Sequence, residues 1–252
     1  MCAQRFNPWD LDVSHDEELP DYEADEAPAY EDSLVDEVLA RYDLRQYDRK
    51  TRVLRACGTW AASGYRITRN SFRVFSKKPE MEVGYTAPDL RQRSIAAVGF
   101  DKDGPLPWCP RAHVDYMDSN GVVTVHKMEA RNFEDWTMTL DGRRYEWSVA
   151  TQPWSLVLRE VGASVIIARF TYSPFGTRAM RGAEVGELLV FRDGLTAAAN
   201  GHDVVVCSLM VALGHMEKMG RMYHNPEVWR AGAMTREHIP ANGASSASVS
   251  MV

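Results

Sequence analysis

The sequence lacks the features of a secreted or zinc-binding protein. Its 252 residues include four cysteines, Cys2, Cys57, Cys109 and Cys207, and none of them forms a CxxC pair. This spacing argues against a zinc ribbon or a thioredoxin-like site, and scattered thiols are typical of a reducing compartment. The opening stretch MCAQRFNPWDLDVSHDEE has neither a basic region nor an apolar core, so it is not a secretory signal. We therefore expect a cytoplasmic protein.

Signatures of catalysis are missing as well. The chain has no GxSxG elbow, no Walker A loop, no HExxH and no dinucleotide fingerprint after a strand. We therefore expect a protein that is not an enzyme and that uses no cofactor or metal. The formal net charge of −6 argues against a nucleic-acid partner, because such proteins are usually basic.

Charge is spread unevenly along the chain. Residues 1–50 hold 15 acidic and 5 basic side chains, whereas the remainder has a small basic excess. Residues 1–32 are rich in Asp, Glu, Pro and Ala, which predicts a disordered acidic arm. Within it, Leu19, Pro20 and Tyr22 resemble the LPxY ligands of WW domains, so a WW-domain protein is one predicted partner. The small, polar residues 226–252 predict a disordered tail.

Residues 33–50 have an apolar pattern of helical period. Leu34, Val38 and Tyr42 lie four residues apart, and Ser33 is placed to cap the N-terminus of a helix. We expect a short amphipathic helix over residues 33–50.

From about residue 52 to 192 the chain shows short alternating runs separated by turn residues, which predicts a mainly β domain that we place at residues 51–225. The expected strands lie near 52–57, 65–75, 80–86, 94–100, 112–117, 121–127, 133–140, 143–150, 154–160, 164–172 and 185–192. The best-defined pair is DWTMTLDGRRYEWSV, residues 135–149, in which Asp141-Gly142 forms a two-residue hairpin loop. That register places Trp136, Met138, Tyr145 and Trp147 on one face.

A long apolar segment, GHDVVVCSLMVALGHMEKMGRM, follows the expected strands at residues 201–222. A membrane span needs about 20 apolar residues, and the apolar run here, Val204 to Leu213, is too short. A helix that is apolar on every side must be buried on every side. We expect a closed antiparallel barrel of about twelve strands around this helix, with a helix between two sheets as the alternative. Asp203 is expected to favour the positive end of the helix and to help cap it.

These parts resemble a known family. The residues that carry the resemblance are Gly142, Tyr145 and Trp147, then Leu156 and Leu158, then Ala168 and Phe170, all before the apolar helix. In this order they resemble the tubby C-terminal-like superfamily, which includes tubby domains, phospholipid scramblases and plant LURP-one-related proteins, and are similar to uncharacterised fungal members. The resemblance implies a twelve-stranded barrel around a central helix. It also implies phosphoinositide binding through basic surface residues, but scramblase chemistry is not implied, because the chain has no cysteine cluster.

Basic residues near expected turns are the candidate lipid site. They are Lys77, Lys78, Arg91, Arg93, Arg143 and Arg144, with Arg178 and Arg181 in a later loop. Together they predict a peripheral module that binds anionic phospholipid headgroups through charge-assisted hydrogen bonds. The alternative is a soluble adaptor that binds WW-domain proteins through the acidic arm. His113, Asp115 and His126 could form an acid–base or metal group if their strands make a hairpin, but ordinary strand positions are the preferred interpretation.

Overall fold

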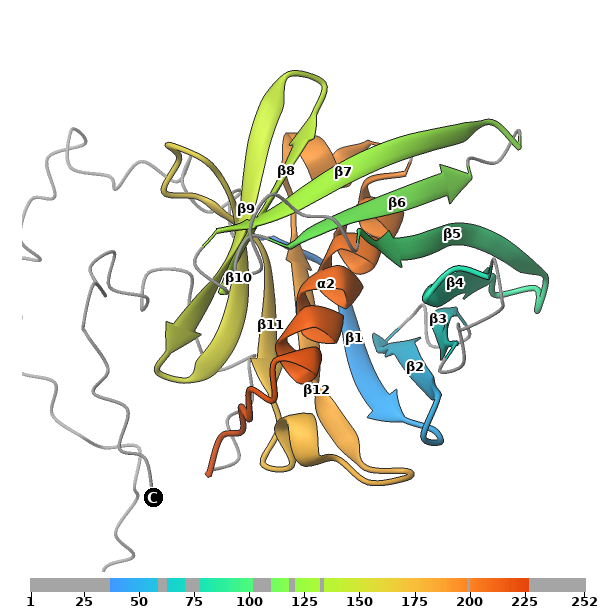
Figure 1. The fold of residues 1–252 in the computed structure, drawn as a ribbon, viewed down its shortest axis with the longest axis vertical. Coiled ribbons are helices and arrows are strands. Elements are labelled where there is room, and N and C mark those ends of the chain that lie inside the picture. The colour runs from blue at the N-terminus through green and yellow to red at the C-terminus, as the bar shows by residue number, and fades with distance from the viewer. Residues whose placement is uncertain are drawn as a thin grey trace, which may run out of the picture. The chain divides into compact units, whose positions relative to one another are not determined.

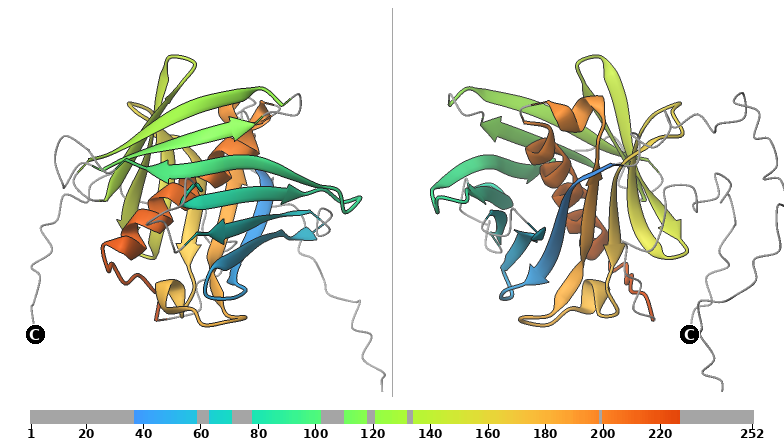
Figure 2. Two further views of the ribbon diagram at one scale, coloured as in Figure 1. Left: turned by 45° about the vertical axis from the view of Figure 1, so that its right-hand side comes forward. Right: turned by 180° about the vertical axis from the view of Figure 1, so that it is seen from behind.

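Twelve antiparallel strands close into a barrel in the computed structural model of this chain (Figure 1). The structure describes residues 37–58, 63–70, 78–101, 110–117, 121–131, 134–198 and 200–226. Each strand pairs with its sequence neighbours, and β1 also pairs with β12, which closes the barrel. Figure 2 shows β1 and β12 side by side when the molecule is seen from behind. The expected fold class is confirmed.

The elements follow one another in simple order. The strands are β1 (Val38–Gln46), β2 (Thr51–Ala56), β3 (Gly64–Arg69), β4 (Met81–Thr86), β5 (Gln92–Phe100), β6 (Arg111–Met117), β7 (Val123–Arg131), β8 (Asp135–Leu140), β9 (Arg143–Thr151), β10 (Trp154–Glu160), β11 (Ile166–Tyr172) and β12 (Glu184–Phe191). The helices are the one-turn η4 (Gly176–Arg178) and α1 (Gly194–Ala197), followed by α2 (Gly201–Lys218).

The hairpin of β8 and β9 has the register that the sequence predicts. Trp136 lies opposite Trp147, and Met138 lies opposite Tyr145. All four of these side chains belong to the buried core. The loop residue Gly142 has φ 77°, a left-handed conformation that glycine adopts without strain.

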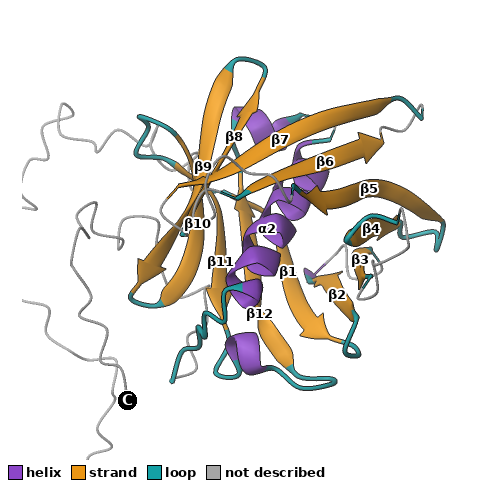
Figure 3. Cartoon of the chain, viewed as in Figure 1, coloured by secondary structure: helices purple, strands orange, loops and turns teal. Residues whose placement is uncertain are grey.

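Helix α2 runs through the barrel and is buried on every side, as the sequence predicts (Figure 3). Every residue from Val205 to Met216 is buried. The one hydroxyl in this run is satisfied, because Trp147 Nε1 donates to Ser208 Oγ at 2.9 Å and Ser208 Oγ donates to the Val205 carbonyl at 3.0 Å. The helix therefore forms the centre of the hydrophobic core.

The expected helix over residues 33–50 is wrong where the structure describes it. Residues 38–46 form strand β1, and alternate side chains Ala40, Tyr42 and Leu44 face the core. Pairing with β2 and β12 overrides the local helical pattern. The barrel therefore begins at Val38 rather than at residue 51. The predicted acidic arm and residues 227–252 of the predicted tail lie outside the described residues.

The barrel has two chemically different ends. We call the end where α2 begins the entry end, because Asp203 there contacts β3, β5 and β6. We call the end where α2 finishes the exit end, because Glu217 there pairs with Arg52 of β2 and Arg69 of β3. In Figure 1 the exit end lies at the bottom, beside η4.

Candidate functional site

The loop 173–183 at the exit end is held in place on two sides. Its Gly182 N–H donates to the Gln46 carbonyl at 2.6 Å, which ties it to the end of β1. On the other side, the Thr177 N–H donates to the Tyr223 carbonyl at 3.0 Å, just after α2. Ser173 Oγ accepts from the Gly176 N–H at 3.0 Å and so shapes the turn before η4. The loop therefore presents its outer side chains from a fixed backbone.

Large apolar side chains of this loop project into solvent. Phe175 is 61% exposed and Met180 is 80% exposed. Met222, which is 57% exposed, lies beside the same loop, since its Sδ accepts from the Thr177 hydroxyl at 3.6 Å. Single exposed apolar residues are ordinary, but a group at one end of a barrel is typical of a contact surface.

Basic side chains lie in the same loop and in the β1–β2 turn, which the loop contacts through Gly182 and Gln46. Arg178 and Arg181 flank Met180 in the loop. Arg49 and Lys50 lie in the turn between β1 and β2. Within the described part of the chain, none of these four forms an ion pair within 4.0 Å. We call this group the basic–apolar surface, and it consists of Arg49, Lys50, Phe175, Arg178, Met180 and Arg181.

Asp48 is the acidic residue next to this surface. Hydrogen bonds from the backbone N–H groups of Lys50 and Thr51 lower its pKa, and the charge of Arg181 adds to the effect. Asp48 Oδ1 accepts from those two N–H groups at 2.7 and 2.8 Å, which shapes the turn that carries Arg49 and Lys50. Among the described residues of this turn and loop, one carboxylate thus accompanies four cationic side chains, which leaves an excess of positive charge.

The end of α2 behind this surface is fixed by ion pairs. Glu217 pairs with both Arg52 and Arg69. Lys218 pairs with Glu80, and its Nζ lies 3.8 Å from the centre of the Phe100 ring. A carboxylate is unfavourable near the C-terminus of a helix, and the two arginines offset that cost. The exit end is therefore a rigid base for the loop.

The structure does not bring the sequence-predicted basic residues into one site. Lys78 precedes β4 at the exit end, and Lys77 lies outside the described residues. Arg91 and Arg93 lie at the start of β5, at the entry end. Arg143 and Arg144 begin β9, and Arg143 pairs with Glu160 at 3.6 Å. The candidate headgroup residues are thus divided between the two ends.

The structure does not test the predicted WW-domain ligand, and it separates the candidate histidines. Leu19, Pro20 and Tyr22 lie outside the described residues, so the WW-domain partner stays a prediction. On strand β7, His126 lies opposite the core residue Val114 of β6. His113 directly precedes Val114 and therefore faces outward, where its Nδ1 lies 2.9 Å from Asp101 Oδ1. The two histidines are on opposite faces of the barrel wall and do not form a pair.

Asp203 does more than the capping that the sequence suggests. The N-cap of α2 is Asn200, and Asp203 lies within the first turn. Its carboxylate is buried and accepts hydrogen bonds from Tyr65 at 2.8 Å, Tyr116 at 3.1 Å and Arg93 at 2.7 Å. The position near the positive end of the helix is favourable, as expected. Asp203 joins the helix to three strands.

Comparison of the chain with family models, with curated proteins and with solved structures found no match. The resemblance to the tubby-like superfamily therefore stays a prediction from strand motifs. In the part of the chain that the structure describes, no helix combines the length and the apolar character that crossing a membrane requires.

Sequence reasoning found only part of the basic–apolar surface. The sequence identifies Arg178 and Arg181 as basic residues of a loop, but the prediction gives no binding role to Phe175 or Met180. The available signal was the stretch FGTRAMRG, in which apolar and basic residues alternate within eight residues of a turn-rich segment. Arg49 and Lys50 join them only because β1 and β12 are neighbours in the closed barrel.

Proposed function

We propose that this chain is a non-enzymatic peripheral module that binds membranes containing anionic phospholipids through the basic–apolar surface. The observation that carries the proposal is the pairing of exposed Phe175 and Met180 with four cationic side chains on one fixed loop and its neighbouring turn. Side chains of these two kinds bind a membrane together, because the apolar groups enter the headgroup boundary while the cations attract acidic lipids.

The expected strength can be estimated from the charges. Each Lys or Arg near an anionic leaflet contributes about 1 kcal/mol, so four such residues contribute about 4 kcal/mol. Insertion of Phe175 and Met180 adds a part of the roughly 1.5–3 kcal/mol that full burial of each side chain would give. The attraction is screened by salt, so binding should weaken as ionic strength rises.

Vesicle co-sedimentation at low salt tests this proposal. Wild type should bind phosphatidylcholine vesicles that contain phosphatidylserine, and should ignore vesicles of phosphatidylcholine alone. The double change Arg178→Gln and Arg181→Gln should weaken binding about 30-fold, the equivalent of two lost charges. Phe175→Ser should weaken it about tenfold.

Matched controls come from the entry end. The double change Arg143→Gln and Arg144→Gln removes two exposed charges there, and Leu90→Ser removes an apolar side chain that is 75% exposed. Both variants should bind like wild type. The proposal fails if wild type does not bind the acidic vesicles, or if the controls weaken binding as much as the loop variants. Vesicles of equal charge that contain a phosphoinositide would show whether the headgroup itself is recognised.

A further inference from the structure

A pocket opens at the entry end, on the far side of the barrel from the basic–apolar surface. Its volume is about 580 Å³, and its walls come from β1 to β5 and from the start of α2. This volume is in the range of small-molecule sites, and the mouth of a β-barrel is a common position for them. The side chains that matter below are Tyr42, Tyr65, Tyr85, Arg93, His202 and Asp203.

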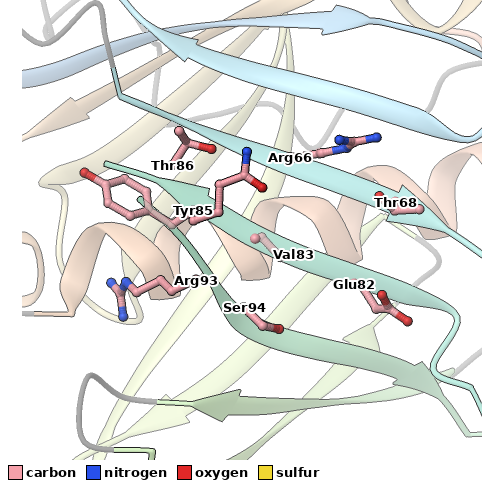
Figure 4. Close-up of a pocket in the computed structure, with 10 residues that line it drawn as sticks. Arg66, Thr68, Glu82, Val83, Tyr85, Thr86, Arg93 and Ser94 are labelled. Carbon is pink, nitrogen blue, oxygen red and sulfur yellow. The ribbon is translucent and has the colours of Figure 1, made fainter. Parts of the chain in front are cut away.

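A second, shallower depression of about 230 Å³ lies on the outer face of β3, β4 and β5. It shares two residues with the pocket, and Figure 4 shows them, Tyr85 and Arg93, at one end of the depression. Its remaining wall is formed by short or polar side chains such as Thr68 and Ser94. The larger pocket is therefore the better candidate for a ligand with an apolar body.

The polar centre of the pocket is the Arg93 guanidinium. One nitrogen, Nη2, donates to Asp203 at 2.7 Å, and the group lies 5.4 Å from the centre of the Tyr85 ring. The other nitrogen, Nη1, is buried and has no hydrogen-bond partner among the described residues. The Arg93 side chain as a whole is 38% exposed, so the accessible part of the guanidinium can donate to a ligand that supplies an oxygen.

The remaining walls add little charge. Burial lowers the pKa of His202, although the Asp203 carboxylate opposes the effect, and burial raises the pKa of Tyr42 to about 12. Both side chains are therefore neutral near pH 7, and they lie within hydrogen-bond distance, with the Tyr42 hydroxyl 3.3 Å from His202 Nδ1. The charge of Arg93 is balanced by Asp203. The rings of Tyr42 and Tyr65 are buried, and the half-buried ring of Tyr85, which packs against Tyr65, provides apolar surface.

We propose that this pocket binds a small molecule with an aromatic or acyl body and an oxygen acceptor, a carboxylate or a carbonyl, that accepts from the exposed part of the Arg93 guanidinium. The body lies against the Tyr85 ring. Asp203 holds the guanidinium at the pocket. Because the pocket and the basic–apolar surface are at opposite ends of the barrel, a ligand can enter while the protein is bound to a membrane.

The test compares three compounds with the same ring system: 2-naphthoate, 2-naphthamide and 2-naphthylmethylamine. Binding is measured by saturation-transfer NMR and calorimetry with the full chain. The acid and the amide should bind, and the amine, which offers no acceptor, should not. Binding of the acid alone would assign a carboxylate ligand, and equal binding of acid and amide would assign a carbonyl.

Two variants locate the binding. Arg93→Lys keeps a cation beside Asp203 but loses the planar guanidinium and its additional N–H groups, and it should weaken binding of the tighter-binding compound at least tenfold. Ala198→Trp, at an exposed position of the pocket wall, should block entry without changing the core. Arg111→Lys, whose arginine forms an exposed pair with Glu129, is the matched control and should have no effect. The proposal is overturned if neither acid nor amide binds at about 1 mM, if the amine binds equally, or if Ala198→Trp leaves binding unchanged.

Discussion

Asp203 is the residue that joins the first turn of α2 to β3, β5 and β6. In Asp203→Asn the charge is lost, and Arg93 keeps its positive charge without a counterion. Because the Arg93 side chain is 38% exposed, solvent reduces this penalty, and we expect the free energy of unfolding to fall by about 2 kcal/mol. Urea denaturation measures this free energy of unfolding. Asp89→Asn, which breaks an exposed pair with Arg91, should cost less than about 0.5 kcal/mol, and an equal loss in both variants would contradict the role of Asp203.

His215 makes stability depend on pH. Burial, with a smaller effect of the Lys218 charge, lowers its pKa from 6.5 to about 4, and its ring lies against Trp136 at 5.1 Å. Below pH 6.5 the unfolded chain therefore binds a proton that the folded protein does not, so stability falls as the pH is lowered from 6.5 towards 4. We expect wild type to lose about 2 kcal/mol more than His215→Gln between pH 7 and pH 5. Equal losses in urea denaturation at the two pH values would show that His215 is not responsible.

At the scale of elements, the sequence predicts those whose signal is local. Asp141-Gly142 specifies the β8–β9 hairpin to the residue, because the turn and the alternation of both strands agree. The apolar run from Val204 to Leu213 predicts a buried helix. Strand β1 was missed because Leu34, Val38 and Tyr42 fit a helical period, and the partner that decides its conformation, β12, lies more than 140 residues later. The same non-local closure hid two of the four cations of the basic–apolar surface, Arg49 and Lys50.

Helix α2 should be indispensable to the barrel. Val206 is fully buried at the centre of the core, so Val206→Asp places a charge where no water or partner can stabilise it. We expect loss of the folded domain, measured as loss of the near-ultraviolet circular dichroism signal. Val125→Asp makes the same change on β7 at a side chain that is 55% exposed, and this variant should fold. A folded Val206→Asp protein would mean that the helix is peripheral.

The β8–β9 turn should depend on glycine at one position. Gly142 has φ 77°, so Gly142→Ala forces a side chain into a left-handed conformation and should cost about 1 kcal/mol. Gly194, at the start of α1, has open space around it and no positive φ, so Gly194→Ala should be neutral or slightly stabilising. Thermal denaturation of the two variants distinguishes these outcomes. Equal changes in melting temperature would mean that the left-handed conformation of Gly142 does not determine the cost of the substitution.

At the scale of the whole molecule, the barrel should unfold as one unit. Each strand has two partners, and all twelve strands contribute side chains to one hydrophobic core together with α2. Tryptophan fluorescence reports on this core through Trp136 and Trp147, and far-ultraviolet circular dichroism reports on the strands. We expect the two signals to give the same urea midpoint. Separate midpoints would indicate that part of the barrel is stable without the rest.

Closure by β1 and β12 also sets an order of events during synthesis. The ribosome makes β1 first, but the strand that completes its pairing and the helix that fills the core are made last. At 5–20 residues per second the first strands wait about 10–30 s with their apolar faces uncovered. The chain therefore depends on protection while it is incomplete, and a nascent chain arrested at residue 200 should be digested by protease where the finished protein is not.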